Sequence, residues 1–285
     1  MNPDPTRFTR IAIAGLGLMG GSLARALKQL PDPPHISAIS RDPEEIRAGL
    51  DAGVIDEGPG SPERLLREID LLVYATPLKA TLSLMATHRP FLPAGAAVTD
   101  VVSLKGPVLT RAKELGLQGR FVGSHPMVGG TGTGFEHSSD KLYQGARIWL
   151  VAGSKGGASL LERIRTFWLD LGGRPAEISM TRHDELMAWV SHLPQLTSNA
   201  LALALKRNGL PHGHLGSGGR DMTRLAGSGL EMWRDLLAAA PGSLPRALEA
   251  AEEALAELRA LLSSGDLDGI TDRMRETRGW VEEDR

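Results

Sequence analysis

The 285-residue chain is 41% hydrophobic and contains no cysteine, so it can build one or two domains with sizeable cores but no disulfide or cysteine-liganded zinc site. Its formal net charge of −2 and aromatic content of 4% argue against nucleic-acid and anionic-membrane partners. No apolar run is long enough to span a bilayer, and the first ten residues lack an apolar export signal. We therefore expect a cytoplasmic protein whose partner is a small molecule.

A glycine-rich turn connects the first predicted strand, Ile11 to Ala14, to a helix that carries Leu23 and Leu27 on one face. Its GxGxxG pattern, set between a strand and a helix, is the fingerprint of a dinucleotide site. The glycines permit a tight turn, close approach of a pyrophosphate and close packing of the helix, whose positive end attracts phosphate. The predicted cofactor-binding residues in this turn are Gly15, Gly17, Leu18, Met19 and Gly20.

The residues after the second predicted strand, His35 to Ile39, bear on the choice of cofactor. NAD sites place an acidic residue near this point to bind the ribose 2′-hydroxyl. Here Ser40 and Arg41 can instead bind and neutralise a 2′-phosphate, which favours NADP. Asp42 caps the next helix or reaches the ribose, so NAD remains an alternative.

Further strands alternate with helices as far as residue 178. The remaining strands are predicted at Ile69–Tyr74, Ala96–Val102, Phe121–Gly123, Ile148–Ala152 and Pro175–Ile178, with helices at Pro43–Ala52, Pro107–Leu115 and Gly157–Leu171. This alternation predicts an α/β fold, a doubly wound parallel sheet of the Rossmann type. We expect residues 1–179 to form this dinucleotide-binding domain.

Polar residues follow several of these strands: Thr76 with Pro77, then Ser103, then His125. The carboxyl ends of parallel strands meet at one edge of a sheet, so we expect these side chains to converge beside the cofactor. His125 also precedes a glycine-rich segment, residues 129–134. We predict that His125 is catalytic, the alternative being a histidine without a chemical role.

Helical spacing replaces the strand pattern from Met180 onward, which predicts an all-α domain over residues 180–285. Pro194 is expected to kink the first helix or to start a new turn, and His192 and Gln195 share a face if the turn stays helical. A later apolar stripe comprises Leu248, Ala251, Leu255, Leu258 and Leu262. It favours a homodimer formed through the helical domain over packing within one chain.

Two arginines in this half, Arg220 and Arg224, are candidates to bind a carboxylate through a bidentate guanidinium. The alternative is that one of them pairs with Asp221. His212 and His214 have metal-ligand spacing, but no third ligand is apparent, and we expect no metal site.

The sequence resembles the prephenate/arogenate dehydrogenase family of tyrosine biosynthesis from Arg10 to about Gly279. The motifs that carry the resemblance are Gly15–Ala24, Ala75–Pro77, Thr99–Lys105, Gly123–Met127, His183–Asp184, Ser191–Pro194 and Gly219–Arg224. The resemblance implies oxidative decarboxylation of a cyclohexadienol, with hydride passing from C4 to a nicotinamide as the C1 carboxylate leaves as CO2. Prephenate would give 4-hydroxyphenylpyruvate, and arogenate would give tyrosine.

By this resemblance the catalytic base falls on His125, and Ser103 orients it and touches both the hydroxyl and the nicotinamide. The carboxylate-binding arginine falls on Arg224, with Arg220 as second choice. The residues expected at the substrate are Arg224, Arg220, His192, Gln195, Gly130 and Thr131.

Three features matter in the comparison with the family, and the first is that the second predicted strand ends in Ser40 and Arg41, as in members that resemble NADP users. Gln195 stands where some prephenate-using members have a second histidine, so prephenate and arogenate both remain open. Gly130, followed by Thr131, replaces a frequent threonine. We expect no appended regulatory domain. Another reductase, of the β-hydroxyacid dehydrogenase kind, and a non-catalytic NADP-binding protein are the competing interpretations.

Overall fold

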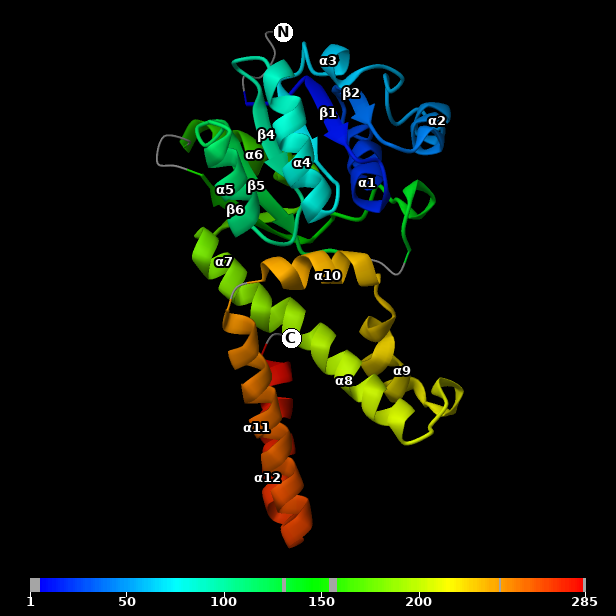
Figure 1. Cartoon of the computed structure of the whole chain (residues 1–285), viewed down its shortest axis with the longest axis vertical. Coiled ribbons are helices and arrows are strands. Elements are labelled where there is room, and N and C mark those ends of the chain that lie inside the picture. The colour runs from blue at the N-terminus through cyan, green and yellow to red at the C-terminus, as the bar shows by residue number, and fades with distance from the viewer. Residues whose placement is uncertain (1–5, 130–131, 154–157, 241, 284–285) are drawn as a thin grey trace. The chain divides into compact units, whose positions relative to one another are not determined.

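The computed structural model describes residues 6–129, 132–153, 158–240 and 242–283 (Figure 1). The chain divides into two compact units. Unit 1 comprises Met1–Met187 and Ser228–Ala240, and unit 2 comprises Ala188–Gly227 and Pro241–Arg285. The domain boundary expected between residues 179 and 180 stays a prediction.

Unit 1 is built on a seven-stranded sheet in the order β2-β1-β3-β4-β5-β6-β7. The strands are β1 (Arg10–Ala14), β2 (His35–Ile39), β3 (Leu71–Tyr74), β4 (Ala97–Asp100), β5 (Phe121–Pro126), β6 (Arg147–Ala152) and β7 (Arg174–Glu177). Later strands lie on both sides of β1, with β2 on one side and β3 on the other, as in a doubly wound fold. The predicted α/β fold is therefore confirmed, with a strand at each of the seven predicted places.

Helices cover both faces of the sheet. The helices of unit 1 are α1 (Leu18–Leu27), α2 (Pro43–Asp51), α3 (Pro62–Leu65), α4 (Leu78–His88), α5 (Gly106–Glu114), α6 (Ala158–Asp170), α7 (Met180–Met187) and α10 (Leu230–Ala239), with short 3₁₀ turns η1 (Arg89–Phe91) and η2 (Phe135–His137). Alternate strand residues point to opposite faces: Ile13 joins a core with Leu23 and Trp168, and Ala12 joins one with Met85.

One strand pair differs from the predicted parallel sheet. β5 and β6 run antiparallel, with Pro126 opposite Ile148, whereas every other pair in the sheet is parallel. A parallel connection normally carries a helix across one sheet face. The segment between these strands, residues 127–146, contains only η2 among its described residues, so it leaves and re-enters the sheet at the same edge.

This connection packs against α1. The backbone N–H of Ser139 donates to Ser22 Oγ over 2.9 Å, and the Tyr143 hydroxyl donates to the carbonyl of Met19 over 2.7 Å. The segment that follows β5 therefore supports the helix that follows the glycine-rich turn.

Unit 2 is helical. It contains the π-helical turn η3 (Ala188–His192), α8 (Leu193–Arg207), η4 (His212–His214), α9 (Ser217–Thr223), η5 (Arg224–Gly227), α11 (Ser243–Ser264) and α12 (Leu267–Glu282). Figure 1 shows α11 and α12 side by side as two long helices. The irregularity expected at Pro194 takes the form of the π turn just before it, because proline cannot donate the backbone hydrogen bond that a continuous helix would need at this position. Among the described residues, no helix is both long and apolar enough to cross a membrane.

Candidate active site

The glycine-rich turn after β1 has the geometry that a dinucleotide requires. Gly15 has φ +94°, and a Cβ added there would lie 2.6 Å from Thr76 Cγ2, while one at Gly20 would lie 1.8 Å from the Gly15 carbonyl oxygen. A Cβ at Gly17 would meet only Glu45 Oε1, at 3.6 Å. Gly17 caps α1 without a side-chain hydrogen bond, so the first N–H groups of α1 face a position that a pyrophosphate can approach.

The neighbouring predicted cofactor residues lie around this turn. Leu18 and Met19 form the start of α1. Thr76 follows β3, and its hydroxyl lies 2.8 Å from that of Thr81, which also donates to the Thr76 carbonyl. Pro77 is the N-cap of α4. The loop after β3 is thus held against the glycine turn, and the residues present fit a bound dinucleotide.

The end of β2 carries a compact polar cluster. The Ser40 hydroxyl donates to Glu45 Oε2 over 2.7 Å and accepts from the Asp42 N–H over 3.1 Å. Asp42 caps α2 by accepting from the Glu44 N–H over 2.9 Å, as the capping alternative predicts. A hollow of about 600 Å³ is lined by Ser40, Arg41, Asp42, Pro43 and Glu45. Sequence reasoning missed Glu45, although it stands three residues after the N-cap, where side chains commonly reach back.

His125 lies at the carboxyl end of β5 in a buried chain of hydrogen bonds. Its Nδ1 lies 2.9 Å from His183 Nε2, and His183 Nδ1 lies 2.7 Å from Asp184 Oδ1. The Asp184 carboxylate also accepts from the backbone N–H of Lys105 over 2.8 Å and of Gly106 over 2.7 Å. Sequence reasoning gave His183 and Asp184 no chemical role; the signal for them was their adjacency near the start of a helix, in a stretch shared with the family.

This chain fixes which nitrogen of His125 carries the proton. Burial opposes ionisation of Asp184, but the hydrogen bonds from His183, Lys105 and Gly106 outweigh it and lower the pKa of the carboxyl below its usual value. An ionised Asp184 accepts only, so His183 donates to it through Nδ1, and the tautomer with this single proton presents the Nε2 lone pair to His125. His125 therefore donates through Nδ1, and its Nε2 is the basic nitrogen.

Buried polar groups fix the ends of β4 and β5 behind His125. Lys105 Nζ donates to the Asp100 carboxylate and, over 2.6 Å, to the Ser124 carbonyl. The Ser124 hydroxyl lies 2.8 Å from Thr99 Oγ1 and accepts from the Trp168 indole over 2.9 Å. A buried network with all of these groups satisfied holds a side chain in one position.

Ser103 lies in the loop after β4, half-buried. β4 and β5 are parallel neighbours, so Ser103 and His125 follow the sheet at the same edge. The partner of His125 Nδ1 is His183 rather than Ser103. A role for Ser103 therefore concerns the Nε2 side of the imidazole, and it stays a prediction.

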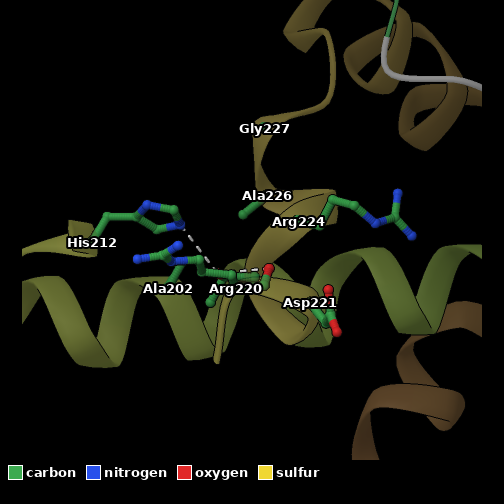
Figure 2. A pocket seen from close by; sticks show the side chains of 8 residues that line it. Ala202, His212, Arg220, Asp221, Arg224, Ala226 and Gly227 are labelled. Atoms are coloured by element: carbon green, nitrogen blue, oxygen red, sulfur yellow. Dashed lines mark hydrogen bonds between the residues drawn. The ribbon is translucent and has the colours of Figure 1, made fainter. Parts of the chain in front are cut away.

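The two candidate arginines lie in unit 2, around a hollow of about 570 Å³ whose lining also includes Ala202, His212, Asp221, Thr223, Ala226 and Gly227. Arg220 is on α9, and Arg224 starts η5. Figure 2 shows the Arg220 guanidinium on the side of His212 and the Arg224 guanidinium pointing to the opposite side. Both residues are exposed, and within the described part of the chain neither pairs with Asp221 or another carboxylate. Each guanidinium is thus available to an anionic ligand.

α8 holds the segment that carries Arg224. Gln195 Nε2 donates to the Leu225 carbonyl over 2.6 Å and to Asn199 Oδ1 over 2.8 Å, and the Ala226 N–H donates to Ser198 Oγ over 3.2 Å. Gln195 therefore supports η5 from α8. His192, one turn earlier, is fully buried. The predicted substrate contacts at Gly130 and Thr131 lie outside the described residues.

Two family models match the chain. The one described as "Prephenate dehydrogenase, nucleotide-binding domain" matches residues 23–177, and that described as "Prephenate dehydrogenase, dimerization domain" matches residues 179–276. The chain belongs to the prephenate dehydrogenase family. Membership in this family confirms the resemblance and decides against the β-hydroxyacid dehydrogenase alternative.

Individual members of the prephenate dehydrogenase family show similarity over most of the chain. A prephenate dehydrogenase of Bacillus subtilis is 30% identical over 80% of this chain, which spans 63% of that protein's length. A cyclohexadienyl dehydrogenase of Zymomonas mobilis is 29% identical over 96% of this chain and 95% of its own. The structure of A. aeolicus prephenate dehydrogenase with hydroxyphenyl propionate and NAD+ covers 97% of this chain and 98% of its own, with a TM-score of 0.88 and 29% identity.

Proposed function

We propose that the protein is a prephenate dehydrogenase, which converts prephenate to 4-hydroxyphenylpyruvate and CO2 with reduction of NAD(P). The observation that carries the proposal is the Asp184–His183–His125 chain, which presents an imidazole nitrogen at the carboxyl end of β5, the same end of the parallel strands β1, β3, β4 and β5 at which the dinucleotide turn follows β1. Membership in the family supports the substrate class.

The residues divide the reaction between them. His125 Nε2 accepts the proton of the C4 hydroxyl, and its Nδ1 stays bonded to His183. Ser103 positions the same hydroxyl, and Arg224 binds a substrate carboxylate. A bound nicotinamide cofactor supplies the hydride acceptor. Loss of CO2 makes the ring aromatic, so the protein mainly has to orient the substrate and provide one base.

We propose NADP as the preferred cofactor and NAD as an alternative, because Arg41 lines the hollow at the end of β2. Arogenate remains the alternative substrate, since Gln195 replaces the histidine of some prephenate-using members. Its amide nitrogen bonds to Asn199 and Leu225 in this structure. Rates with the two substrates measure which of them the protein accepts.

We also propose a homodimer formed through the helical domain. The match to a dimerization domain supports it, as do exposed apolar side chains on α11 and α12, among them Leu255, Leu262, Leu267, Met274 and Trp280. Burial of such residues in a second copy would remove apolar surface from water.

The experiment is an initial-rate assay of four combinations, prephenate or arogenate with NAD or NADP, followed by nicotinamide absorbance. A rate with prephenate that falls by about 10²–10⁴-fold in His125→Asn, with cofactor affinity unchanged, is expected for loss of a general base. A rate with arogenate alone would reassign the substrate. No rate in any combination, from folded protein that binds cofactor, would reject the proposed reaction.

A further inference from the structure

The Glu45 carboxylate lies between two parts of the predicted cofactor site. One oxygen, Oε2, accepts from the Ser40 hydroxyl at the end of β2 over 2.7 Å. The other, Oε1, lies 3.6 Å from the position that a Cβ of Gly17 would take. The adenosine ribose of a dinucleotide lies between the end of β2 and the second fingerprint glycine. Glu45 therefore reaches, from the first turn of α2, the place usually filled by an acidic residue at the end of β2.

Side chains of opposite charge, Arg41 and Glu45, line this hollow. Arg41 lines it and, within the described residues, forms no ion pair, so it is available to a 2′-phosphate. Glu45 lines the same hollow and would repel that phosphate, whereas it can accept a hydrogen bond from a ribose 2′-hydroxyl. Asp42 is also at the hollow, but its Oδ1 caps α2.

We propose that Glu45 is a cofactor-specificity residue that weakens the preference for NADP conferred by Arg41 and gives NAD a hydrogen-bond acceptor for its 2′-hydroxyl. The inference rests on the nucleotide site of the proposed function and deepens it. The chain then uses both cofactors because one cation and one anion face the same ribose position.

A purely structural role for Glu45 makes a different prediction. Glu45 stands three residues after the N-cap Asp42 and bonds to Ser40, so it also helps to start α2. Loss of that support would lower thermal stability and weaken both cofactors alike. A charge-discriminating role instead changes the ratio of the two affinities.

The test measures binding of two fragments, ADP-ribose and 2′-phospho-ADP-ribose, by titration calorimetry. Glu45→Gln keeps the side-chain size and removes the charge. We expect it to raise the affinity ratio of the phosphorylated to the unphosphorylated fragment about tenfold, and the gain to shrink at high salt. Arg41→Ala should lower the same ratio.

Glu44→Gln is the matched control, because it removes the same charge one residue away, from a side chain that pairs with Arg47 and does not line the hollow. It should leave the ratio within about twofold. Equal changes in the Glu44 and Glu45 variants, an unchanged ratio in Glu45→Gln, or no binding of either fragment would overturn the proposal. Because these titrations need no turnover, failure of the dehydrogenase assay would be recognised separately.

Discussion

The residues around His125 in unit 1 and the two arginines of unit 2, Arg220 and Arg224, differ in burial and in hydrogen bonding. His125, His183 and Asp184 are 8%, 0% and 8% exposed, and each is hydrogen-bonded to another group of the chain. Arg220 and Arg224 are exposed and pair with no carboxylate in the described residues. The first region is complete before any ligand arrives, whereas the second keeps its charges available.

The difference follows from the task of each region. A general base must carry its proton on one defined nitrogen and hold one orientation, which requires a fixed and satisfied network. An arginine that binds a carboxylate gains most when the ligand itself supplies the counter-charge. A buried partner for Arg224 within the chain would compete with the substrate.

The largest expected effect comes from Asp184→Asn. The asparagine amide presents either its NH2 group or its neutral oxygen to His183 Nδ1, so this nitrogen loses its anionic acceptor. The tautomers of His183 and His125 are then no longer fixed. We expect kcat to fall about 10²–10⁴-fold and the pH profile of kcat/KM to shift. Asp184 acts through His183, so it is a positioning residue. Lower stability with an unchanged kcat and pH profile for the folded protein would contradict this role.

Arg224→Ala tests the role of the exposed arginines of unit 2. Loss of a charge-assisted bond to a substrate carboxylate should lower kcat/KM about 10–100-fold, or roughly 1.5–3 kcal/mol. Arg220→Ala is the matched variant, and we expect a smaller loss because its guanidinium points to the opposite side (Figure 2). Steady-state kinetics with prephenate measure both. A larger effect at Arg220 would exchange the two assignments.

The smallest expected effect concerns His88, a buried histidine outside the site. It measures what burial alone does to a histidine, for comparison with the hydrogen-bonded pair of Asp184 and His183. His88 stacks on Tyr74, and burial lowers its pKa to about 4. The unfolded chain, with a pKa near 6.5, binds the proton more readily. The free energy of unfolding should therefore fall as pH drops from 6.5 toward 4, by roughly 1–2 kcal/mol between pH 7 and 5.

Urea unfolding of the wild type and His88→Phe at both pH values measures this dependence. The variant should lose part of the difference between pH 7 and pH 5, because phenylalanine cannot bind a proton. The same difference in both proteins would show that other groups cause it.

Local patterns in the sequence predicted most of unit 1. Apolar runs such as Ile11–Ala14 end at turn residues, and strands and turns depend on near neighbours in the chain. The direction of β6 was not predictable in this way, because it depends on long-range contacts such as those of Ser139 and Tyr143 with α1. The hydrogen bond between His125 and His183 joins residues 58 positions apart, which periodicity cannot reveal. Glu45 was missed because an acidic residue in a first helical turn is ordinary on stability grounds alone.

The antiparallel direction of β6 has a consequence for how the chain between β5 and β6 can change in length among relatives. Pro126 and Ile148 face each other across β5 and β6, so the register of the pair is set inside the sheet and not by the length of the chain that joins them. Insertions or deletions that spare the residues packed on α1, such as Ser139 and Tyr143, would then reshape the rim next to His125 while the strands keep their pairing. We expect the part of the connection that does not pack on α1 to be where relatives can alter the substrate they accept with little cost to folding.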